Sequence, residues 1–309
     1  MKTNAIVRIV LLSVAIVLLL GILLAGVGLR IYSVNFAGSV ENHSGDLDLE
    51  VMQVDLAGAV SAEEVRSISV DWVSGTVSLL PGDVEEITFS ETDVEDERDK
   101  LTWKLDGSTL KIQYCRESFS FPSFGINIST PSKDLVITVP RDWVCDTLEI
   151  DCASASVNIH EMTIREVDFD GASGKCSFYD CAVEELDLDT ASGDVAFTGT
   201  LDSLDCDAAS ASCDIIVANI PRKIDIDTAS GDLDLTLPED CGFTCELDSM
   251  SGDFVSDFET TSSNGRHTHG DGSCKITVSA MSGDVTIRKG TACTVPDCTD
   301  ESHNHQKHH

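Results

Sequence analysis

The sequence predicts an all-β fold: a single-stranded parallel β-solenoid with rungs of about 19 residues, preceded by one N-terminal transmembrane helix. Three features of the 309-residue chain predict it: a short motif at nearly constant spacing, apolar residues that alternate on both sides of that motif, and one long uncharged run near the start. We take the coil to be right-handed, because crossovers between parallel strands almost always are.

The apolar run occupies residues 5–29, and Arg8 is its only charge. The 21 residues that follow Arg8 are uncharged, which is long enough for a helix that spans a bilayer. A cleaved secretory signal peptide is the alternative. The apolar stretch is long for such a peptide, and Ala25-Gly26-Val27 is a poor cleavage site. We therefore expect an uncleaved signal anchor.

The cations around this run predict its orientation. Lys2 and Arg8 precede the uncharged stretch, whereas Arg30 stands alone after it. Because cations favour the inner side of a membrane, residues 1–4 should form a short cytoplasmic end. The sequence thus predicts a single-pass plasma-membrane protein that contacts the lipid bilayer through its N-terminal helix and carries an extracellular C-terminal domain.

One motif recurs through most of the chain: an Asp, two small residues, a Ser, and then Gly or Ala. The motif serines lie 19, 19, 18, 20, 21 and 31 residues apart. A period near 19 with small variations is typical of a solenoid. The copies are DCASA at Asp151, DGASG at Asp170, DTASG at Asp189, DAASA at Asp207, DTASG at Asp227 and DSMSG at Asp248, with looser copies DWVSG at Asp71 and SAMSG at Ser279.

Apolar residues alternate on both sides of each motif serine. They lie six and four positions before it and three and five after it; around Ser192 they are Leu186, Leu188, Val195 and Phe197. Ser256 is an exception. This period of two indicates half-buried strands, and the Ser-Gly corner between them is a turn. A single rung cannot bury its own apolar residues, so stacked rungs should form continuous columns.

The remaining segments complete the predicted organisation. Residues 30–66 are polar and should form a stalk. Residues 67–140 resemble irregular β-structure that starts the solenoid, and residues 141–290 hold the regular rungs. Residues 291–309 form a polar, His-containing tail that we expect to be disordered.

The repeated turns resemble those of a widespread bacterial putative-adhesin domain family. The matching stretches are VDWVSGTVSL, LDLDTASGDVAF, IDIDTASGDLDL and MSGDVTI, and the likeness covers roughly residues 67–290. The resemblance implies a membrane-anchored β-helix of the T-A-S-G-D-V repeat type, a surface location and nothing catalytic. Some members of that family are single-pass proteins linked to cell-envelope stress. The cysteine richness of this chain is not part of the family pattern.

Charge excludes one class of partner. The 54 acidic and 20 basic residues give a net charge of −34, which would repel a nucleic acid. The 12 cysteines leave two interpretations open, since an exported domain could form disulfides whereas buried thiols pack as small hydrophobes. A local bridge is easier to picture at Cys293 and Cys298. The inward-facing cysteines are Cys176, Cys206, Cys213 and Cys245.

Outward positions of successive rungs carry acidic ladders. Like charges on strands about 4.8 Å apart repel by roughly 1 kcal/mol per pair in water. Either Ca²⁺ or a basic polymer or protein bridges them, or they form a solvated face with counterions and some raised pKa values. We favour the solvated face and predict weak binding of cations. Three positions before the motif serine lie Asp151, Asp170, Asp189, Asp207, Asp227 and Asp248; five before it lie Glu149, Asp168, Asp187, Asp205, Asp225 and Glu246; two after it lie Asp194, Asp232, Asp253 and Asp284, interrupted by Ser156, Lys175 and Ser212.

The sequence contains no motif for catalysis or for binding a cofactor. H-E-x-x-H, G-x-S-x-G, the P-loop and G-x-G-x-x-G are all missing. His267 and His269 could be a metal pair, but two ligands rarely suffice, so we expect a mobile polar loop there. The sequence predicts no catalytic, cofactor-binding or metal-binding residue.

These features favour a non-enzymatic, membrane-anchored cell-surface protein: a structural or adhesive solenoid that presents an acidic face to a protein or envelope polymer. The alternative is an accessory or sensor protein of an envelope-stress system. A polysaccharide-active enzyme is the third interpretation, because paired carboxylates can serve as acid and base.

Overall fold

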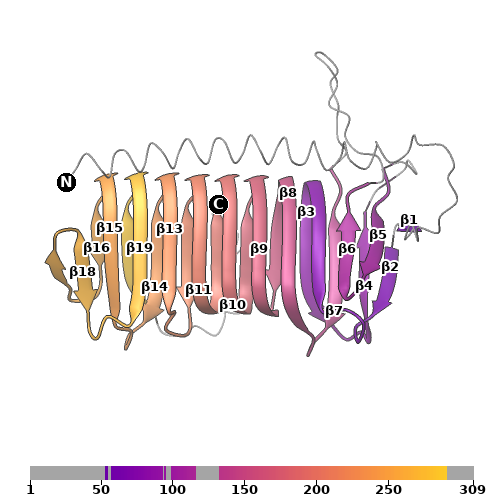
Figure 1. Ribbon diagram of the computed structural model, residues 1–309, viewed down its shortest axis with the longest axis horizontal. Helices are drawn as coiled ribbons and strands as arrows, with labels where there is room; N and C mark the ends of the chain where they lie inside the picture. Colours follow the sequence, from indigo (N-terminus) through magenta and orange to yellow (C-terminus); the bar gives the residue numbers. More distant parts are fainter. Residues whose placement is uncertain (1–52, 55–56, 93, 95–98, 116–131, 291–309) are drawn as a thin grey trace, which may run out of the picture.

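The computed structural model describes residues 53–54, 57–92, 94, 99–115 and 132–290 (Figure 1). All regular structure in these ranges is β, and its strands form one hydrogen-bonded sheet that coils around a single core. The predicted all-β solenoid is confirmed. The predicted cytoplasmic end, transmembrane segment and tail lie outside the described residues. Along the described ranges, no helix is long and apolar enough to cross a membrane.

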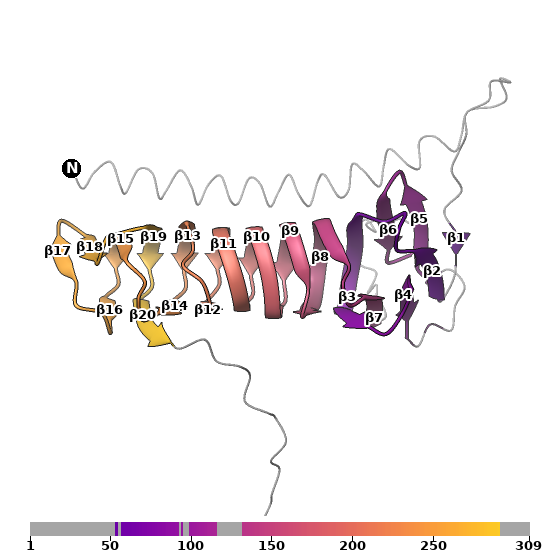
Figure 2. The ribbon, with the colours of Figure 1, turned by 90° about the horizontal axis from the view of Figure 1, so that it is seen from below.

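The rungs stack along the long axis as parallel strands in two facing layers (Figures 1 and 2). The longest strands bend at a corner and contribute to both layers. The strands that build the rungs are β3 (Ser67–Gly82), β8 (Val144–His160), β9 (Thr163–Ser173), β10 (Cys176–Ser192), β11 (Val195–Ser210), β12 (Cys213–Val217), β13 (Lys223–Ser230), β14 (Leu233–Pro238), β15 (Phe243–Ser251), β16 (Phe254–Ser256), β19 (Cys274–Ser282) and β20 (Val285–Gly290).

The motif serines lie in register along the stack. Ser173 pairs with Ser192, Ser192 with Ser210, and Ser210 with Ser230. Like positions therefore lie above one another, which confirms the register predicted from the repeat. The inward positions form columns of buried side chains; Phe178 and Phe197 are almost completely buried, and their ring centroids lie 5.7 Å apart. Burial of these columns supplies the main stabilisation.

Glycine after the motif serine allows the corners to stack closely. Gly193 has a φ of 145°, and a Cβ atom added to it would lie 1.9 Å from the carbonyl oxygen of Gly174 in the neighbouring rung. Gly283 meets the oxygen of Gly231 in the same way. Only a residue without a side chain fits there.

At the C-terminal end, the order of the rungs in space differs from their order in the sequence. β19 lies between β13 and β15, so that Ser282 pairs with Ser230 on one side and with Ser251 on the other. β20 lies between β14 and β16 in the same manner. We predicted a stack in chain order; in the structure, the last rung in the sequence is inserted before the preceding one. The spacing of 31 residues between the motif serines Ser251 and Ser282 is longer than the others because of this exchange.

A hairpin covers the outer edge of β15. It consists of β17 (Thr261–Ser263) and β18 (Arg266–His269), and β18 pairs with β15 in antiparallel fashion. The expectation of a mobile polar loop was wrong, because backbone pairing and ring contacts hold this segment. The His267 ring stacks on Phe254 at 3.8 Å, and His269 packs against Phe258 at 4.8 Å. The hairpin thus satisfies an edge that could otherwise pair with another chain.

The N-terminal end shows a similar exchange. β3 lies between β8 on one side and β6 (Thr109–Gln113) and β7 (Leu135–Pro140) on the other, although both of these follow it in the sequence. Antiparallel strands extend the two layers beyond them. These strands are β5 (Thr102–Asp106) and β1 (Gln53–Val54) in one layer, and β4 (Glu86–Glu91) and β2 (Ala57–Ser61) in the other. The described part of the predicted stalk therefore includes sheet, because β2 pairs with β4.

A buried ion pair closes the core at this end. The Lys133 Nζ lies 2.5 Å from Glu91 Oε2, and both side chains are almost fully inaccessible to solvent. The same ammonium group donates to the carbonyl oxygen of Asp99 at 2.6 Å and lies 4.1 Å from the ring centroid of Tyr114. Glu91 in turn accepts a hydrogen bond from the backbone of Leu101 at 2.7 Å. Each charge is thus paired and hydrogen-bonded, as burial requires.

The register can be tested by comparing an inward with an outward position of one rung. We expect Phe197→Asp to lower the free energy of unfolding by about 4 kcal/mol or more, because it places an unpaired charge in the core column. Asp194 is exposed, so Asp194→Asn should change stability by less than about 0.5 kcal/mol. Denaturant unfolding of both variants measures this difference. Equal losses would contradict the register.

Candidate functional site

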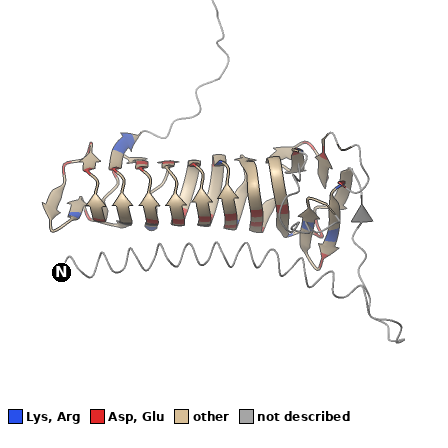
Figure 3. Ribbon diagram, turned by 90° about the horizontal axis from the view of Figure 1, so that it is seen from above, with Lys and Arg blue, Asp and Glu red and all other residues tan. Residues whose placement is uncertain are grey.

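Two rows of carboxylates run along one outer face of the solenoid, and we call them together the acidic face. They alternate with buried residues of the same strands, so their side chains point outward. Figure 3 shows acidic residues recurring at the same level of successive strands. The first ladder is Asp71, Asp151, Asp170, Asp189, Asp207 and Asp227; the second is Glu149, Asp168, Asp187, Asp205 and Asp225.

Each ladder joins residues that are direct partners in the parallel register. Asp189, for example, pairs with Asp170 on one side and with Asp207 on the other. Parallel strands lie about 4.8 Å apart, so each inner carboxylate has two like charges nearby. The first ladder covers six rungs, and Asp71 extends it by one rung at the N-terminal end beyond the regular motif copies.

The exchanged rung ends both ladders earlier than the sequence predicted. β19 places Ser279 beside Asp227 and Thr277 beside Asp225. Asp248 and Glu246 were predicted to continue the ladders, but they lie one rung further, beyond these neutral residues. The sequence already contained an indication that the first ladder is interrupted here, because the looser copy SAMSG has Ser279 in place of the motif aspartate.

Basic side chains contact the second ladder but not the first. Lys223 Nζ lies 3.0 Å from Asp205 Oδ2 and 3.1 Å from Asp225 Oδ2. In the described part of the chain, no Lys or Arg forms an ion pair with a member of the first ladder. Its terminal Asp71 accepts a hydrogen bond from the Gln113 side chain at 2.9 Å. Sequence reasoning missed both contacts, because Gln113 and Lys223 fall outside the motif.

Loss of hydration and, after it, neighbouring like charges raise the pKa values of five carboxyl groups of the first ladder. Loss of hydration, followed by the charge of Asp71, raises the pKa of Asp151 to about 7. Loss of hydration and then the neighbouring carboxylates raise the pKa of Asp189 and of Asp207 to about 6. The pKa values of Asp170 and Asp227 are raised for the same leading reason. The ladder therefore retains protons at a pH where isolated aspartates would have lost theirs.

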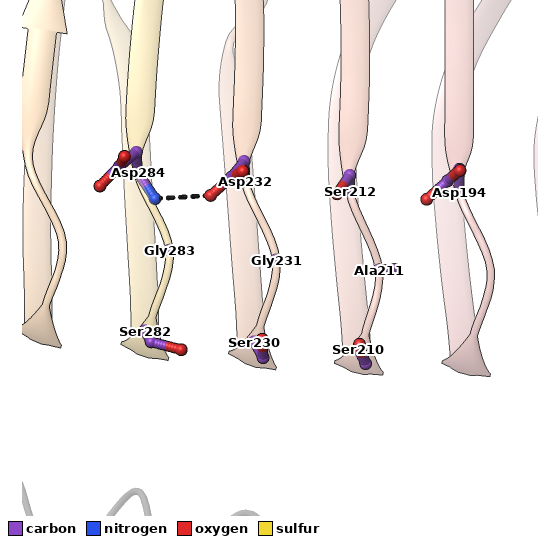
Figure 4. A pocket seen from close by; sticks show the side chains of 10 residues that line it. All are labelled: Asp194, Ser210, Ala211, Ser212, Ser230, Gly231, Asp232, Ser282, Gly283 and Asp284. Carbon is purple, nitrogen blue, oxygen red and sulfur yellow. Dashed lines mark hydrogen bonds between the residues drawn. The ribbon is translucent and has the colours of Figure 1, made fainter.

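A shallow groove of about 370 Å³ follows the corner turns (Figure 4). Its aspartates bind neighbouring backbone: the carboxylate of Asp232 accepts from the N–H of Asp284 at 2.9 Å, and that of Asp284 accepts from the N–H of Asp253 at 2.8 Å. These bonds explain the aspartate after Ser-Gly in the motif. The residues that line the groove are Asp194, Ser210, Ala211, Ser212, Ser230, Gly231, Asp232, Ser282, Gly283 and Asp284.

The structure does not bring His267 and His269 into a cluster of metal ligands. The His267 ring hydrogen-bonds with the Ser262 hydroxyl at 2.8 Å, and His269 Nδ1 contacts the carbonyl oxygen of Glu259 at 2.8 Å. Across the described ranges, no group of three or more His, Cys, Asp or Glu residues is arranged to hold a metal ion. Among these residues the carboxylates of the acidic face are therefore not gathered into a preformed set of metal ligands.

The model of the Toastrack DUF4097 family matches residues 65–288. Among solved structures, a putative adhesin from Bacteroides fragilis is 12% identical, with a TM-score of 0.42 over 80% of this chain and 100% of that one. A putative lipid binding protein from Parabacteroides distasonis is 14% identical, with a TM-score of 0.36 over 76% and 96%. A putative cell adhesion protein from Clostridium sporogenes is 7% identical, with a TM-score of 0.34 over 78% and 100%. No curated protein matches the chain.

The raised pKa values predict how stability depends on pH. In the unfolded chain the pKa of these carboxyl groups is 3.8, whereas in the folded protein the pKa is about 7 for Asp151 and about 6 for Asp189. The folded state therefore binds more protons between these pH values. The contribution of the ladder to stability is therefore full below about pH 4 and is lost as the pH rises to about 7. In low salt, Asp151→Asn should flatten this part of the curve of melting temperature against pH.

Asp248→Asn is the matched control for this titration, because Asp248 lies beyond Ser279 and outside the first ladder. We expect the control to keep the slope of the unmodified protein. A slope that is unchanged in Asp151→Asn would show that the ladder does not hold protons.

A calcium titration separates a diffuse face from a specific site. We expect weak, non-saturating stabilisation by Ca²⁺ at constant ionic strength, because the carboxylates are spread along the ladder. One specific site at 100 times its dissociation constant would add about 2.7 kcal/mol. A saturable rise in melting temperature at micromolar Ca²⁺, absent from the double variant Asp189→Asn with Asp227→Asn, would overturn this prediction.

Proposed function

The chain belongs to the Toastrack DUF4097 family, and on that premise we propose that it is a non-enzymatic, membrane-anchored surface protein whose acidic face binds a basic partner. The family match confirms the resemblance to the putative-adhesin family that the repeated turns indicated. The partner we propose is a protein or an envelope polymer that carries positive charge. The net charge of −34 argues against a nucleic acid as this partner, because the two polyanions would repel each other.

The first ladder is the observation that carries this proposal. Its six carboxylates are direct neighbours, and the described part of the chain pairs none of them with Lys or Arg. Loss of hydration and, after it, repulsion between the carboxylates raise the pKa values of these groups and so disfavour the charged ladder in the folded state. A cationic partner would lower this repulsion on binding. An opposite potential also steers a partner to the surface and increases the association rate.

The stacked rungs of the solenoid display the acidic face as a regular array of carboxylates. Eight rungs with motif serines span about 34 Å at the spacing of parallel strands. Both ends are covered by antiparallel strands, which limits pairing of the stack with other copies. The spacing of the carboxylates is therefore fixed by the backbone and matches an extended chain with regularly spaced cations.

The location is part of the proposal. The uncharged run after Arg8 is long enough to span a bilayer, and Lys2 and Arg8 favour an N-terminus on the inner side. The solenoid would then lie outside the plasma membrane, where cationic proteins and polymers are accessible to it.

A second candidate is an accessory or sensor protein of an envelope-stress system. The observation that favours it is the raised pKa of Asp151, about 7, and of Asp189, about 6. The charge of the face would then change with external pH and with bound cationic peptides. A pull-down from intact membranes separates the two candidates: a sensor would retain a signalling membrane protein, whereas an adhesive protein would retain envelope material.

The proposal predicts that intact cells with the full-length chain bind a fluorescent oligolysine. Neutralising three members of the first ladder (Asp170→Asn, Asp189→Asn and Asp207→Asn) should lower this binding at least about tenfold, because multiple charge contacts are lost. External protease should remove both the solenoid and the bound signal.

The matched control neutralises three exposed acids outside the acidic face: Asp214, Glu239 and Asp240. It changes the net charge by the same amount. Equal binding by both triple variants would show that only net charge matters, and a chain protected from external protease would refute the surface location.

A further inference from the structure

Two pairs of buried cysteines differ from the other thiols of the solenoid. Among the described residues there are ten free cysteines, nine of them buried. Three of the other thiols donate hydrogen bonds to backbone carbonyl oxygens: Cys145 to Thr147, Cys152 to Ala155, and Cys181 to Ile159. In the first of the two exceptional pairs, thiol faces thiol; in the second, Cys274 lies beside the backbone that follows Cys241.

The first pair lies within one rung. Cys206 is on β11, four residues before Ser210, and Cys213 is on β12, three residues after it. These two positions face one another across the core, and their sulfur atoms are 3.9 Å apart. Cys206 is 0% and Cys213 is 3% exposed. In the neighbouring rungs the same positions hold Leu188 with Val195 and Ile226 with Leu233.

The second pair joins the exchanged rungs. Cys274 begins β19 and is the register partner of Phe243 on β15, and Cys241 lies just before that strand. The backbone N–H of Cys274 donates to the carbonyl oxygen of Gly242, the residue after Cys241, at 3.0 Å, and both cysteines are fully buried. This pair therefore connects the inserted rung to the one outside it.

We propose that Cys206 forms a disulfide with Cys213, and Cys241 with Cys274, when the chain folds in an oxidising environment. The thiols of the first pair already lie in contact, so a modest approach of the sulfur atoms brings them to bonding distance. In the second pair, the hydrogen bond from Cys274 to Gly242 places the two cysteines on adjacent backbone segments. The proposed surface location would supply such an environment, but the geometry of the pairs does not depend on it.

The oxidant is an external disulfide, such as glutathione disulfide or the active-site disulfide of an oxidoreductase. One cysteine, as the thiolate, attacks a sulfur of the external disulfide, which releases one thiol and forms a mixed disulfide. The second cysteine then attacks the mixed disulfide and releases the other thiol. Two thiols of this chain thus lose two electrons and two protons. The external disulfide takes up these electrons and protons and is released as two thiols. Because the native pairs are buried, the exchange takes place during folding.

The first bond would connect parts of the fold that backbone pairing does not, and the second would reinforce the backbone pairing of β15 with β19. The bond of Cys206 with Cys213 would join the two layers across the core. The bond of Cys241 with Cys274 would enclose the hairpin β17–β18 and fix the exchanged order of β15 and β19. The longer of the two loops should contribute more stabilisation, because it restricts the unfolded chain more.

The experiment refolds the reduced, full-length chain in a mixture of reduced and oxidised glutathione. Remaining thiols are alkylated in denaturant, and the disulfides are mapped by mass spectrometry. Cleavage before Asp207 separates Cys206 from Cys213, and trypsin separates Cys241 from Cys274 at Arg266. We expect these two pairs to be linked, Cys152 and Cys181 to be alkylated, and the melting temperature to be higher than in dithiothreitol by about 5 °C.

Two double variants make the test specific. Cys206→Ala with Cys213→Ala should lose part of the difference between oxidised and reduced protein, whereas Cys152→Ala with Cys181→Ala should keep all of it. Alkylation of all four paired cysteines in the oxidising buffer would overturn the proposal, as would their linkage to other cysteines. Because the refolding is performed in solution, this result is independent of where the protein resides in the cell.

Discussion

Parallel, in-register pairing of the rungs is the constraint on which the rest of the structure depends. When each strand pairs with its neighbour at equal positions, residues of the same kind lie above one another. Inside the coil this produces the columns that contain Phe178 and Phe197. Outside it produces the ladder of Asp170, Asp189 and Asp207. The stabilising core and the repulsive face therefore have the same cause, and the first must outweigh the second.

The motif itself follows from this register. Its glycine has no side chain that would meet the carbonyl oxygen of the next corner. The aspartate after it accepts a backbone hydrogen bond from the neighbouring rung, as Asp232 does from Asp284. The aspartate before the serine has no such structural partner along most of the first ladder. The aspartate after the serine thus has a clear role in the fold, whereas the aspartate before the serine defines the exposed face.

The repeat predicted the register, the buried columns and most of the acidic face, because all three are periodic. What it could not predict depends on contacts between segments that the period does not relate. The insertion of β19 between β13 and β15 requires knowledge of the hairpin that precedes it. The pairing of Lys133 with Glu91 joins two irregular segments. Positions four before and three after the serine could have been recognised as facing pairs, and Cys206 and Cys213 with them.

The exchanged ends determine how the solenoid would carry a mechanical load. The described chain leaves the coil through β20, which is hydrogen-bonded to β14 along one edge and to β16 along the other. At the opposite end the first described strand, β1, pairs with β5 alone. A force applied at the C-terminal side would have to break two ladders at once, whereas a force applied at the N-terminal side would break one. The rod therefore resists unzipping from its C-terminal end and opens more easily from its N-terminal end.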